Sequence, residues 1–479
     1  MIGRSGGNSM CRHPVPCAVG ETALAMAGKG GYPAVPLRIL ATSDLHANLL
    51  GWDYHSNRVS PQRGLARVAS LIALARSEQP QSLLVDNGDF LHGTALGDYV
   101  VETRPEQRRS RLPFVHPMIA AMNLLRYDAV ALGNHEFSHG VGFLRRSLMA
   151  ANFPLVCSNL YFKPSRGAQL ALPSLLLHKR MLDKAGTAHV LKIGVLGFVP
   201  PQTMIWERRY LKGRASVDDI LTSARLMVPE LRAAGADLVI ALSHSGIGDG
   251  TTATGAENAS SALAAVDGID VVVAGHTHLI YPEDGVQGLH GKPAVMPGFF
   301  GSHLGVIDLA LQKTRKGWVL RSHHSQARPV ARRDPTTARL TACFADDPAV
   351  AAKAMPSHTA LLTKGAAVIS HSAVPLHSFF ALLTETAALS LVARAQIQRL
   401  AEVLRGSDNA NLPILSAVAP FKAGGRGGPE NYTDIPAGPL QLRHLSDLYL
   451  HPNSLTGLRL TGAELAQWLE RSVSLYHRI

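Results

Sequence analysis

Five short stretches of the chain place metal-binding residue types directly after an apolar run. The central one is Asn134-His135-Glu136, which follows the apolar run 128–132 through Gly133. Glycine lets the backbone turn where another residue would clash, so we expect the side chains after it at the rim of a sheet. The other four stretches repeat this order and carry Asp44 with His46, then Asp89, then His244, then His276 with His278.

These stretches offer seven donor side chains: Asp44, His46, Asp89, Asn134, His244, His276 and His278. Imidazole, carboxylate and amide together suit Mn, Zn, Fe, Co or Ni and not Ca. Seven donors are too many for one ion but fit two divalent ions if one carboxylate bridges them. Two ions about 3.5–4 Å apart clamp the attacking and leaving oxygens of an in-line displacement at phosphorus. Each motif alone is more often structural, so the prediction depends on their repetition.

The elements that must position these residues alternate along the chain from Leu37 to about Leu311. Helical periodicity is found at 61–77, 115–125, 218–234 and 260–266, between β-rich apolar runs. Further strands are expected at 192–198 and 305–311. This order predicts an α/β fold, a two-sheet β-sandwich flanked by helices. Ligand sites at the carboxyl ends of strands are the rule in such sheets.

Composition indicates a globular protein with two or three domains, because 46% of the 479 residues are hydrophobic and 17% are charged. Lys and Arg exceed Asp and Glu by 12, and this surplus favours anionic ligands such as phosphates. A generally basic surface is the plainer interpretation. The basic residues are scattered and not interleaved with aromatic residues, so we expect no nucleic-acid polymer as partner.

Several classes of protein are excluded. The four cysteines form no C-x-x-C pair, so neither a zinc ribbon nor a disulfide framework is indicated. No run of about 18 apolar residues occurs, and we expect no membrane span. Residues 1–36 are expected to be a disordered leader. The apolar patch at 22–27 is too weak for a secretion signal, so the chain as written is expected in the cytoplasm.

The domain prediction has three parts after the leader. Residues 37–320 form the catalytic domain. Residues 321–361, which begin with a segment rich in Arg, His, Ser and Pro, form a surface linker with a helix at 347–353. Residues 362–479 form a smaller α+β domain with a strand at 366–370, a helical stretch at 375–404 and a capped helix at 461–470. A helix with an apolar face normally continues into something that covers it, so this domain is expected to be partial.

The motifs Asp44-x-His46, Gly88-Asp89, Gly133-Asn-His-Glu136, His244 and Gly275-His-x-His278 resemble those of the calcineurin-like metallophosphoesterases in order and type. Within that family the chain is similar to the bacterial 5′-nucleotidases and, more closely, to the 2′,3′-cyclic-nucleotide 2′-phosphodiesterase/3′-nucleotidases. The stretches 294–308, 421–426, 432–438 and 447–453 carry the closer likeness. The resemblance covers about residues 37–470.

The resemblance implies that one ion is held by Asp44, His46 and His278. It implies a second ion held by Asn134, His244 and His276, with Asp89 bridging the two. His135 matches the catalytic histidine, which stabilises the phosphoryl transition state or protonates the leaving oxygen. The 5′-nucleotidases place an aspartate three residues after this histidine, where the chain has Ser138. This departure favours the cyclic-nucleotide branch. It leaves open which residue orients His135: Glu136 is one candidate, and a purely structural role for Glu136 is the alternative.

The resemblance also implies that the C-terminal domain binds the nucleoside between two aromatic rings. Tyr432 is the candidate for one ring, and a packed loop tyrosine is the alternative. Lys422 and Arg426 are candidates for phosphate contacts, and Gly424 and Gly425 allow close backbone approach, although a plain flexible loop is also consistent with this composition.

The expected activity is therefore a two-metal phosphohydrolase that opens 2′,3′-cyclic nucleotides and then removes the 3′-phosphate. The alternatives are a 5′-nucleotidase, a phosphoesterase of broad range, or an inactive metal-binding remnant. The expected partner is a nucleotide substrate, and the sequence indicates no oligomeric state. The resemblance implies export to the periplasm, whereas no export signal is recognised at the start of the sequence as written.

Overall fold

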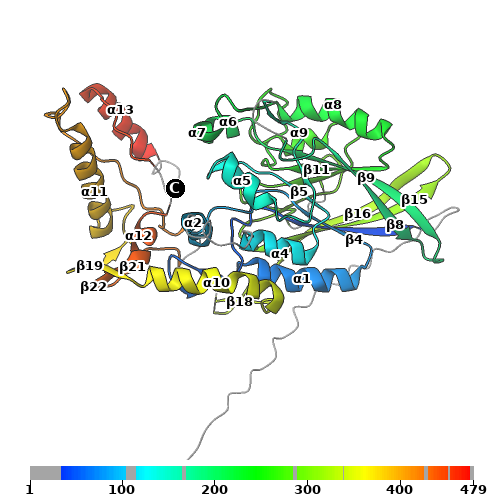
Figure 1. The fold of residues 1–479 in the computed structure, drawn as a ribbon, viewed down its shortest axis with the longest axis horizontal. Helices are drawn as coiled ribbons and strands as arrows, with labels where there is room; N and C mark the ends of the chain where they lie inside the picture. Colours follow the sequence, from blue (N-terminus) through cyan, green and yellow to red (C-terminus); the bar gives the residue numbers. More distant parts are fainter. Residues whose placement is uncertain are drawn as a thin grey trace, which may run out of the picture. The chain divides into compact units, whose positions relative to one another are not determined.

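The computed structural model describes residues 34–103, 115–163, 169–283, 288–337, 339–425, 430–450 and 454–474 (Figure 1). The chain divides into two compact units, Met1–Leu361 and Leu362–Ile479. Most of the predicted leader, together with Arg426, lies outside the described residues.

Two six-stranded sheets form the first unit. The first has the order β16 (Gly317–Pro329), β15 (His303–Thr314), β1 (Val35–Thr42), β4 (Ser82–Asp86), β5 (Ala129–Ala131) and β6 (Leu155–Val156). The second has the order β13 (Ile280–Tyr281), β14 (Ala294–Pro297), β12 (Val271–Ala274), β11 (Leu238–Ser243), β9 (Ala188–Phe198) and β8 (Leu175–Leu182). This confirms the predicted two-sheet α/β fold.

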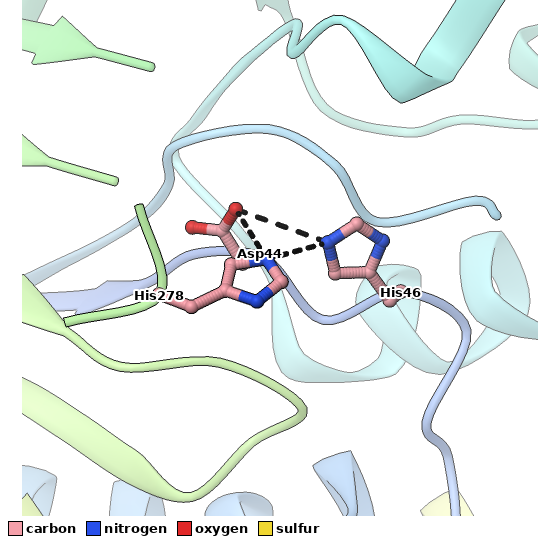
Figure 2. Close-up of side chains that lie close together, drawn as sticks. All are labelled: Asp44, His46 and His278. Carbon is pink, nitrogen blue, oxygen red and sulfur yellow. Dashed lines mark hydrogen bonds and ion pairs between the residues drawn. The ribbon is translucent and has the colours of Figure 1, made fainter. Parts of the chain in front are cut away.

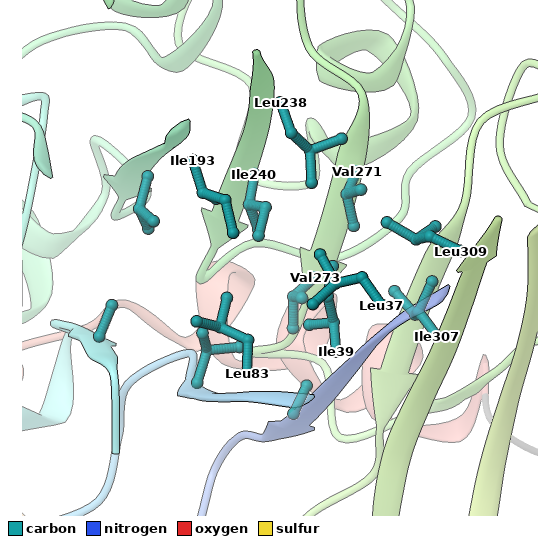
Figure 3. Close-up of a cluster of buried hydrophobic side chains, with 14 of the residues drawn as sticks. Leu37, Ile39, Leu83, Ile193, Leu238, Ile240, Val271, Val273, Ile307 and Leu309 are labelled. Carbon is teal, nitrogen blue, oxygen red and sulfur yellow. The ribbon is translucent and has the colours of Figure 1, made fainter. Parts of the chain in front are cut away.

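The main core lies between the two sheets, where apolar side chains from both inner faces meet (Figure 3). Leu37, Ile39 and Leu83 come from the first sheet, and Ile193 and Ile240 from the second, all at most 1% exposed. Strands covered on both faces are expected to be continuously apolar, as β11 is from Leu238 to Leu242.

Helices cover the outer faces, with α8 and α9 on one side and α1 and α4 on the other (Figure 1). Their bounds are α1 Leu65–Glu78, α4 Pro117–Leu125, α8 Ile220–Ala233 and α9 Ser260–Ala264. Asp219 caps α8 by accepting the Thr222 N–H, as a helix N-cap should. All four helices lie where the periodicity predicted them.

Shorter elements connect these layers. They are β2 (Trp52–Asp53), β3 (Arg58–Val59), α2 (Ala95–Glu102), the 3₁₀ turn η1 (His135–Phe137), α5 (Val141–Leu148), β7 (Leu160–Phe162), α6 (Thr203–Trp206), α7 (Arg208–Leu211), β10 (Ala215–Val217), β17 (Ala331–Arg333) and β18 (Leu340–Ala342). The longer helix α10 (Pro348–Gly365) runs across the boundary between the two units. Within the described residues, every helix is too short or too polar to cross a membrane.

The predicted surface linker at 321–334 was wrong, because most of this segment belongs to β16 and β17. β16 pairs antiparallel with β15, for example His324 with Asp308, and lies at the edge of its sheet. An edge strand pairs on one side only and tolerates charged residues, which is why its composition resembled a loop.

The second unit pairs β19 (Val368–Ser372) with β22 (Gly438–Gln441) and β20 (Leu376–His377) with β21 (Asp434–Ile435). Its helices are α11 (Ala387–Leu404), α12 (Leu442–Leu448) and α13 (Gly462–Ser472). The predicted helical stretch at 375–404 was too long, since β20 and a turn occupy its start. The predicted capped helix is confirmed: Thr461 and Glu464 form a capping box at α13.

Candidate active site

Five parallel strands end at the same edge of the two sheets. In the first sheet Thr42 of β1 is level with Asp86 of β4, and Asp86 is level with Val130 of β5. In the second sheet Ser243 of β11 is level with Ala274 of β12. Because these registers match, the loops that follow the strands meet, and the loops carry the seven predicted donor residues.

The backbone at this edge is strained. Among the described residues, ten non-glycine positions have a positive φ, and five of them are predicted donors: Asp44, His46, Asp89, His276 and His278. Such conformations cost roughly 1–3 kcal/mol each and concentrate at functional sites. The fold therefore forces these side chains inward at an energetic cost.

A first group of donors consists of Asp44, His46 and His278 (Figure 2). The Asp44 Oδ1 atom lies 3.5 Å from His278 Nε2 and 3.9 Å from His46 Nε2. The two Nε2 atoms are 3.0 Å apart. These three atoms can contact one cation together.

A second group consists of Asp44, Asp89 and His244. His244 Nε2 is 3.0 Å from Asp89 Oδ2 and 3.8 Å from Asp44 Oδ1, and Asp89 Oδ2 is also 3.8 Å from His46 Nε2. Asp89 therefore lies between the imidazoles of the two groups. Asp44 also borders both groups, which the motif spacing did not indicate.

His276 lies beside the second group, and Asn134 follows β5 in the loop that carries His135. Asn134 is 4% exposed, and its Oδ1 atom has no hydrogen-bond partner among the described residues. The His276 ring is 5.5 Å from the His244 ring, and its Nε2 atom lies 2.9 Å from Glu257 Oε1. Glu257 is a neighbour that the sequence analysis missed, because it lies in the loop beyond β11 outside any motif.

The imidazole tautomers direct free nitrogen lone pairs into the site. His46 Nδ1 donates to the carbonyl oxygen of His92 at 2.7 Å, and His244 Nδ1 donates to that of Asn87 at 2.8 Å. In the neutral rings Nε2 is then an acceptor that faces carboxylates or another Nε2. His244 Nε2 is buried and makes no well-aligned hydrogen bond in the described structure. Once their Nε2 atoms are free of protons, these converging donors can hold a cation.

Charge at the site supports the same fit. Burial raises the pKa of Asp89, but His244 and His135 outweigh it and hold the net pKa well below its usual range. Burial lowers the pKa of His46 to about 4. At His244 burial also opposes the charged form, but Asp89 and Asp44 raise the pKa to about 10. The ionised carboxylates that favour a protonated, positively charged His244 would also attract a divalent ion. That ion would take the place of the proton on His244.

Glu136 has a structural role. Its carboxylate accepts the backbone N–H groups of Asp89 and Phe90 at 2.8 Å each, of Gly133 at 2.7 Å and of Leu91 at 3.2 Å. Burial next to Asp89 raises its pKa to about 7. Because this carboxylate joins two of the strand-end loops, it does not orient His135.

His135 is oriented by Ser138 and Glu207. The His135 Nδ1 atom lies 3.1 Å from Ser138 Oγ, and the Ser138 hydroxyl donates to Glu207 Oε1 at 2.7 Å. Since the hydroxyl proton goes to Glu207, the Ser138 oxygen accepts from His135 Nδ1. Glu207 lies between α6 and α7, far from any motif, and no sequence signal identified it.

Two glycines permit the closeness of these loops. A Cβ atom on Gly133 would lie 2.2 Å from Asp89 Oδ1. Gly88 has a φ of 97°, and a Cβ atom there would lie 2.4 Å from the Gly133 nitrogen. The loops after β4 and β5 can therefore touch only if both positions lack side chains.

The predicted substrate residues of the second unit have mixed environments. Tyr432 is half-buried, with its ring 5.2 Å from the ring of Phe379. Lys422 is 6% exposed and forms an ion pair with Asp447, so its ammonium group is already occupied and does not reach toward a phosphate. Gly424 and Gly425 both have positive φ, at 75° and 62°, in the loop before the undescribed Arg426.

Comparison with known proteins agrees with this geometry. The family described as Calcineurin-like phosphoesterase matches residues 37–279. The chain is 38% identical to the trifunctional nucleotide phosphoesterase protein YfkN of Bacillus subtilis, over 93% of this chain and 30% of that protein. It is 37% identical to the 2′,3′-cyclic-nucleotide 2′-phosphodiesterase/3′-nucleotidase of Yersinia enterocolitica, over 93% of this chain and 69% of that protein.

Solved structures show the same fold. The crystal structure of calcineurin-like phosphoesterase YfkN from Bacillus subtilis has a TM-score of 0.62 at 36% identity, covering 69% of this chain and 99% of that one. The 5′-nucleotidase precursor from Thermus thermophilus has a TM-score of 0.59 at 22% identity, covering 92% and 79%. With its sequence match, its two-sheet fold and its strand-end donors, the chain belongs to the calcineurin-like phosphoesterase family.

Proposed function

We propose that the chain is a two-metal phosphohydrolase that acts on 2′,3′-cyclic nucleotides. Water adds across the P–O2′ bond to give the 3′-nucleotide, and a second water across the P–O3′ bond gives nucleoside and phosphate. The observation that carries this proposal is the convergence of carboxylate and imidazole donors from four strand ends, with neighbouring donor atoms 3.0–3.9 Å apart. The Yersinia enterocolitica relative, a 2′,3′-cyclic-nucleotide 2′-phosphodiesterase/3′-nucleotidase, supplies the substrate class.

Seven residues would hold the two divalent ions: Asp44, His46 and His278 around one, Asn134, His244 and His276 around the other, and Asp89 between them. Support for the pair comes from two donor groups that share Asp44, with Asp89 of the second group 3.8 Å from His46 of the first. Imidazole and carboxylate donors match Mn, Zn, Fe, Co or Ni. Such ions supply Lewis acidity, which polarises the phosphate and makes water a stronger nucleophile near neutral pH.

His135 would handle the proton of the leaving oxygen. His135 donates its Nδ1–H to Ser138. In the neutral ring Nε2 therefore carries the lone pair, and in the protonated ring Nε2 carries the second proton. Its backbone N–H donates to Asp89 Oδ1 at 2.7 Å, which holds the residue beside the donor cluster. A proton on Nε2 can be given to O2′ or O3′ as the P–O bond breaks.

The experiment gives purified protein Mn²⁺ together with 2′,3′-cyclic AMP, 3′-AMP, 5′-AMP and p-nitrophenyl phosphate in parallel. The proposal expects the highest kcat/KM on 2′,3′-cyclic AMP, with 3′-AMP appearing and then disappearing. A preference for 5′-AMP would make the chain a 5′-nucleotidase. Turnover of p-nitrophenyl phosphate alone would make it a phosphoesterase of broad range, and no turnover with full metal content would make it a metal-binding remnant.

A further inference from the structure

A second cluster of donors lies outside the seven residues of the candidate active site. It consists of His92 in the loop after β4, Asp98 in the first turn of α2, and His139 after η1. His92 Nδ1 is 2.7 Å from His139 Nε2. Asp98 Oδ1 is 3.4 Å from His92 Nδ1 and 3.7 Å from His139 Nε2.

These distances resemble those between donors around one ion. Atoms about 2.0–2.2 Å from a tetrahedral zinc ion lie roughly 3.3–3.6 Å from one another. The two carboxylate distances are close to this range and longer than a good hydrogen bond. The short nitrogen pair has a parallel in the candidate active site, where His46 and His278 place their Nε2 atoms 3.0 Å apart.

We propose that His92, Asp98 and His139 form an accessory site for a first-row divalent cation, with zinc the best match. Two imidazoles and one carboxylate are a common zinc set, with water completing the coordination. Water can reach the cluster, because the side chains of Asp98 and His139 are 36% and 21% exposed. The ring of His139 would rotate slightly to admit the ion between the two nitrogens.

The accessory ion would brace the active site. The carbonyl oxygen of His92 accepts the Nδ1–H of His46, so a fixed His92 fixes the tautomer and direction of that donor. His139 follows directly after Ser138, which orients His135. One ion would therefore tie the loop after β4, whose His92 carbonyl oxygen holds His46, to the segment that carries His135 and Ser138. A simple hydrogen bond between the two imidazoles is the competing interpretation.

The test counts ions. Full-length protein is stripped with a chelator, reloaded with Zn²⁺ alone, dialysed, and assayed for zinc per chain. We expect three ions in the unsubstituted protein and two in His139→Gln. The matched control is His189→Gln, a partly exposed histidine on β9 that lies 2.9 Å from Asp183 and belongs to neither donor cluster, which should keep three. An equal number of zinc ions per chain in the unsubstituted protein and in His139→Gln would mean that His92 and His139 form only a hydrogen-bonded pair.

The expected total of three zinc ions per chain rests on the proposed function, which supplies two of them. A second comparison tests the accessory ion separately from those two. In Asp89→Ala the active-site ions are weakened, yet adding His139→Gln should still remove one further ion. If the active site binds no pair at all, the unsubstituted protein should hold one ion and His139→Gln none. Asp98→Asn provides an independent variant: it should weaken the accessory ion about tenfold or more. An unchanged affinity in Asp98→Asn would also overturn the proposal.

Discussion

The Glu136 carboxylate accepts the backbone N–H of Asp89 at 2.8 Å, although the two residues follow different strands. Three more backbone N–H groups from the same two loops end on this carboxylate. Glu136 is 1% exposed, so water cannot take over the hydrogen bonds that its carboxylate accepts. The position of Asp89 therefore depends on a buried carboxylate that is not one of the seven predicted donors.

Glu136→Gln should destabilise the protein by about 2–4 kcal/mol, because an amide replaces one acceptor oxygen with a donor that faces backbone N–H groups. Thermal or urea unfolding of the metal-free protein measures the change. Glu230→Gln, an exposed site on α8, serves as the control and should unfold like the unsubstituted protein. A Glu136→Gln protein of unchanged stability would show that the loops hold themselves in place.

Asp89→Ala should lose active-site metal and turnover, since the carboxylate lies within 3.0 Å of His244 Nε2 and 3.8 Å of His46 Nε2. The loss in kcat/KM should exceed the roughly 10–100-fold that changes around a metal ligand cause. Metal analysis and turnover of 2′,3′-cyclic AMP are measured on the same preparation. Asp249→Ala in an exposed loop is the control, and a metal content in Asp89→Ala equal to that of the unsubstituted protein would remove Asp89 from the ligand set.

Glu207→Gln should lower kcat by about 10–100-fold with little change in KM, because Ser138 loses the carboxylate that directs its hydroxyl and His135 loses its fixed tautomer. Ser138→Asp would place a carboxylate directly beside His135. In the double variant Ser138→Asp/Glu207→Gln most of kcat should return. A purely structural role for Glu207 predicts no such rescue.

The stability of the first unit should fall in acid through Glu78. Burial alone would raise the pKa of this carboxyl, but hydrogen bonds from Arg328 at 2.7 Å and Arg38 at 2.5 Å outweigh it and lower the pKa. A pKa below the unfolded value means that the stabilisation is complete above about pH 4.5 and is lost as the pH falls through the folded value.

Glu78→Gln should therefore cost about 1–2 kcal/mol at pH 7, and its difference from the unsubstituted protein should shrink below about pH 4. Urea unfolding of both proteins at about pH 7, 5 and 3.5 measures the cost at neutral pH and its decrease in acid. Glu230→Gln again provides the control. A difference that stays constant over this range would mean that the ion pairs contribute nothing measurable.

Tyr432→Ala should raise KM for nucleotides by an amount equivalent to roughly 1–3 kcal/mol of base stacking, while p-nitrophenyl phosphate, which has no nucleobase, should be hydrolysed as before. Phe380→Ala is the matched control, as its ring is 61% exposed. Equal KM values for nucleotides in Tyr432→Ala and the unsubstituted protein would leave Tyr432 as a packed loop residue.

The strand-end donors could be predicted from the sequence because each one follows its own apolar run, so a local pattern carries the information. Glu207 and Glu257 could not, since each reaches the site from a turn or loop whose direction depends on the packing of the whole unit. The same limit explains Lys422: only the folded chain brings Asp447 to its ammonium group. Segment 321–334 was misjudged because pairing with β15, and not its own composition, makes it a strand.

The order of the strands also bears on how the protein is made. β1 is paired on one side with β4 and on the other with β15, which is synthesised more than two hundred residues later. A nascent chain that has just completed β5 already contains Asp44 and Asp89 but none of the histidines from the second sheet. Both active-site donor groups can therefore be complete only after β12 and its loop have left the ribosome, and until β15 emerges one edge of β1 stays open to wrong partners.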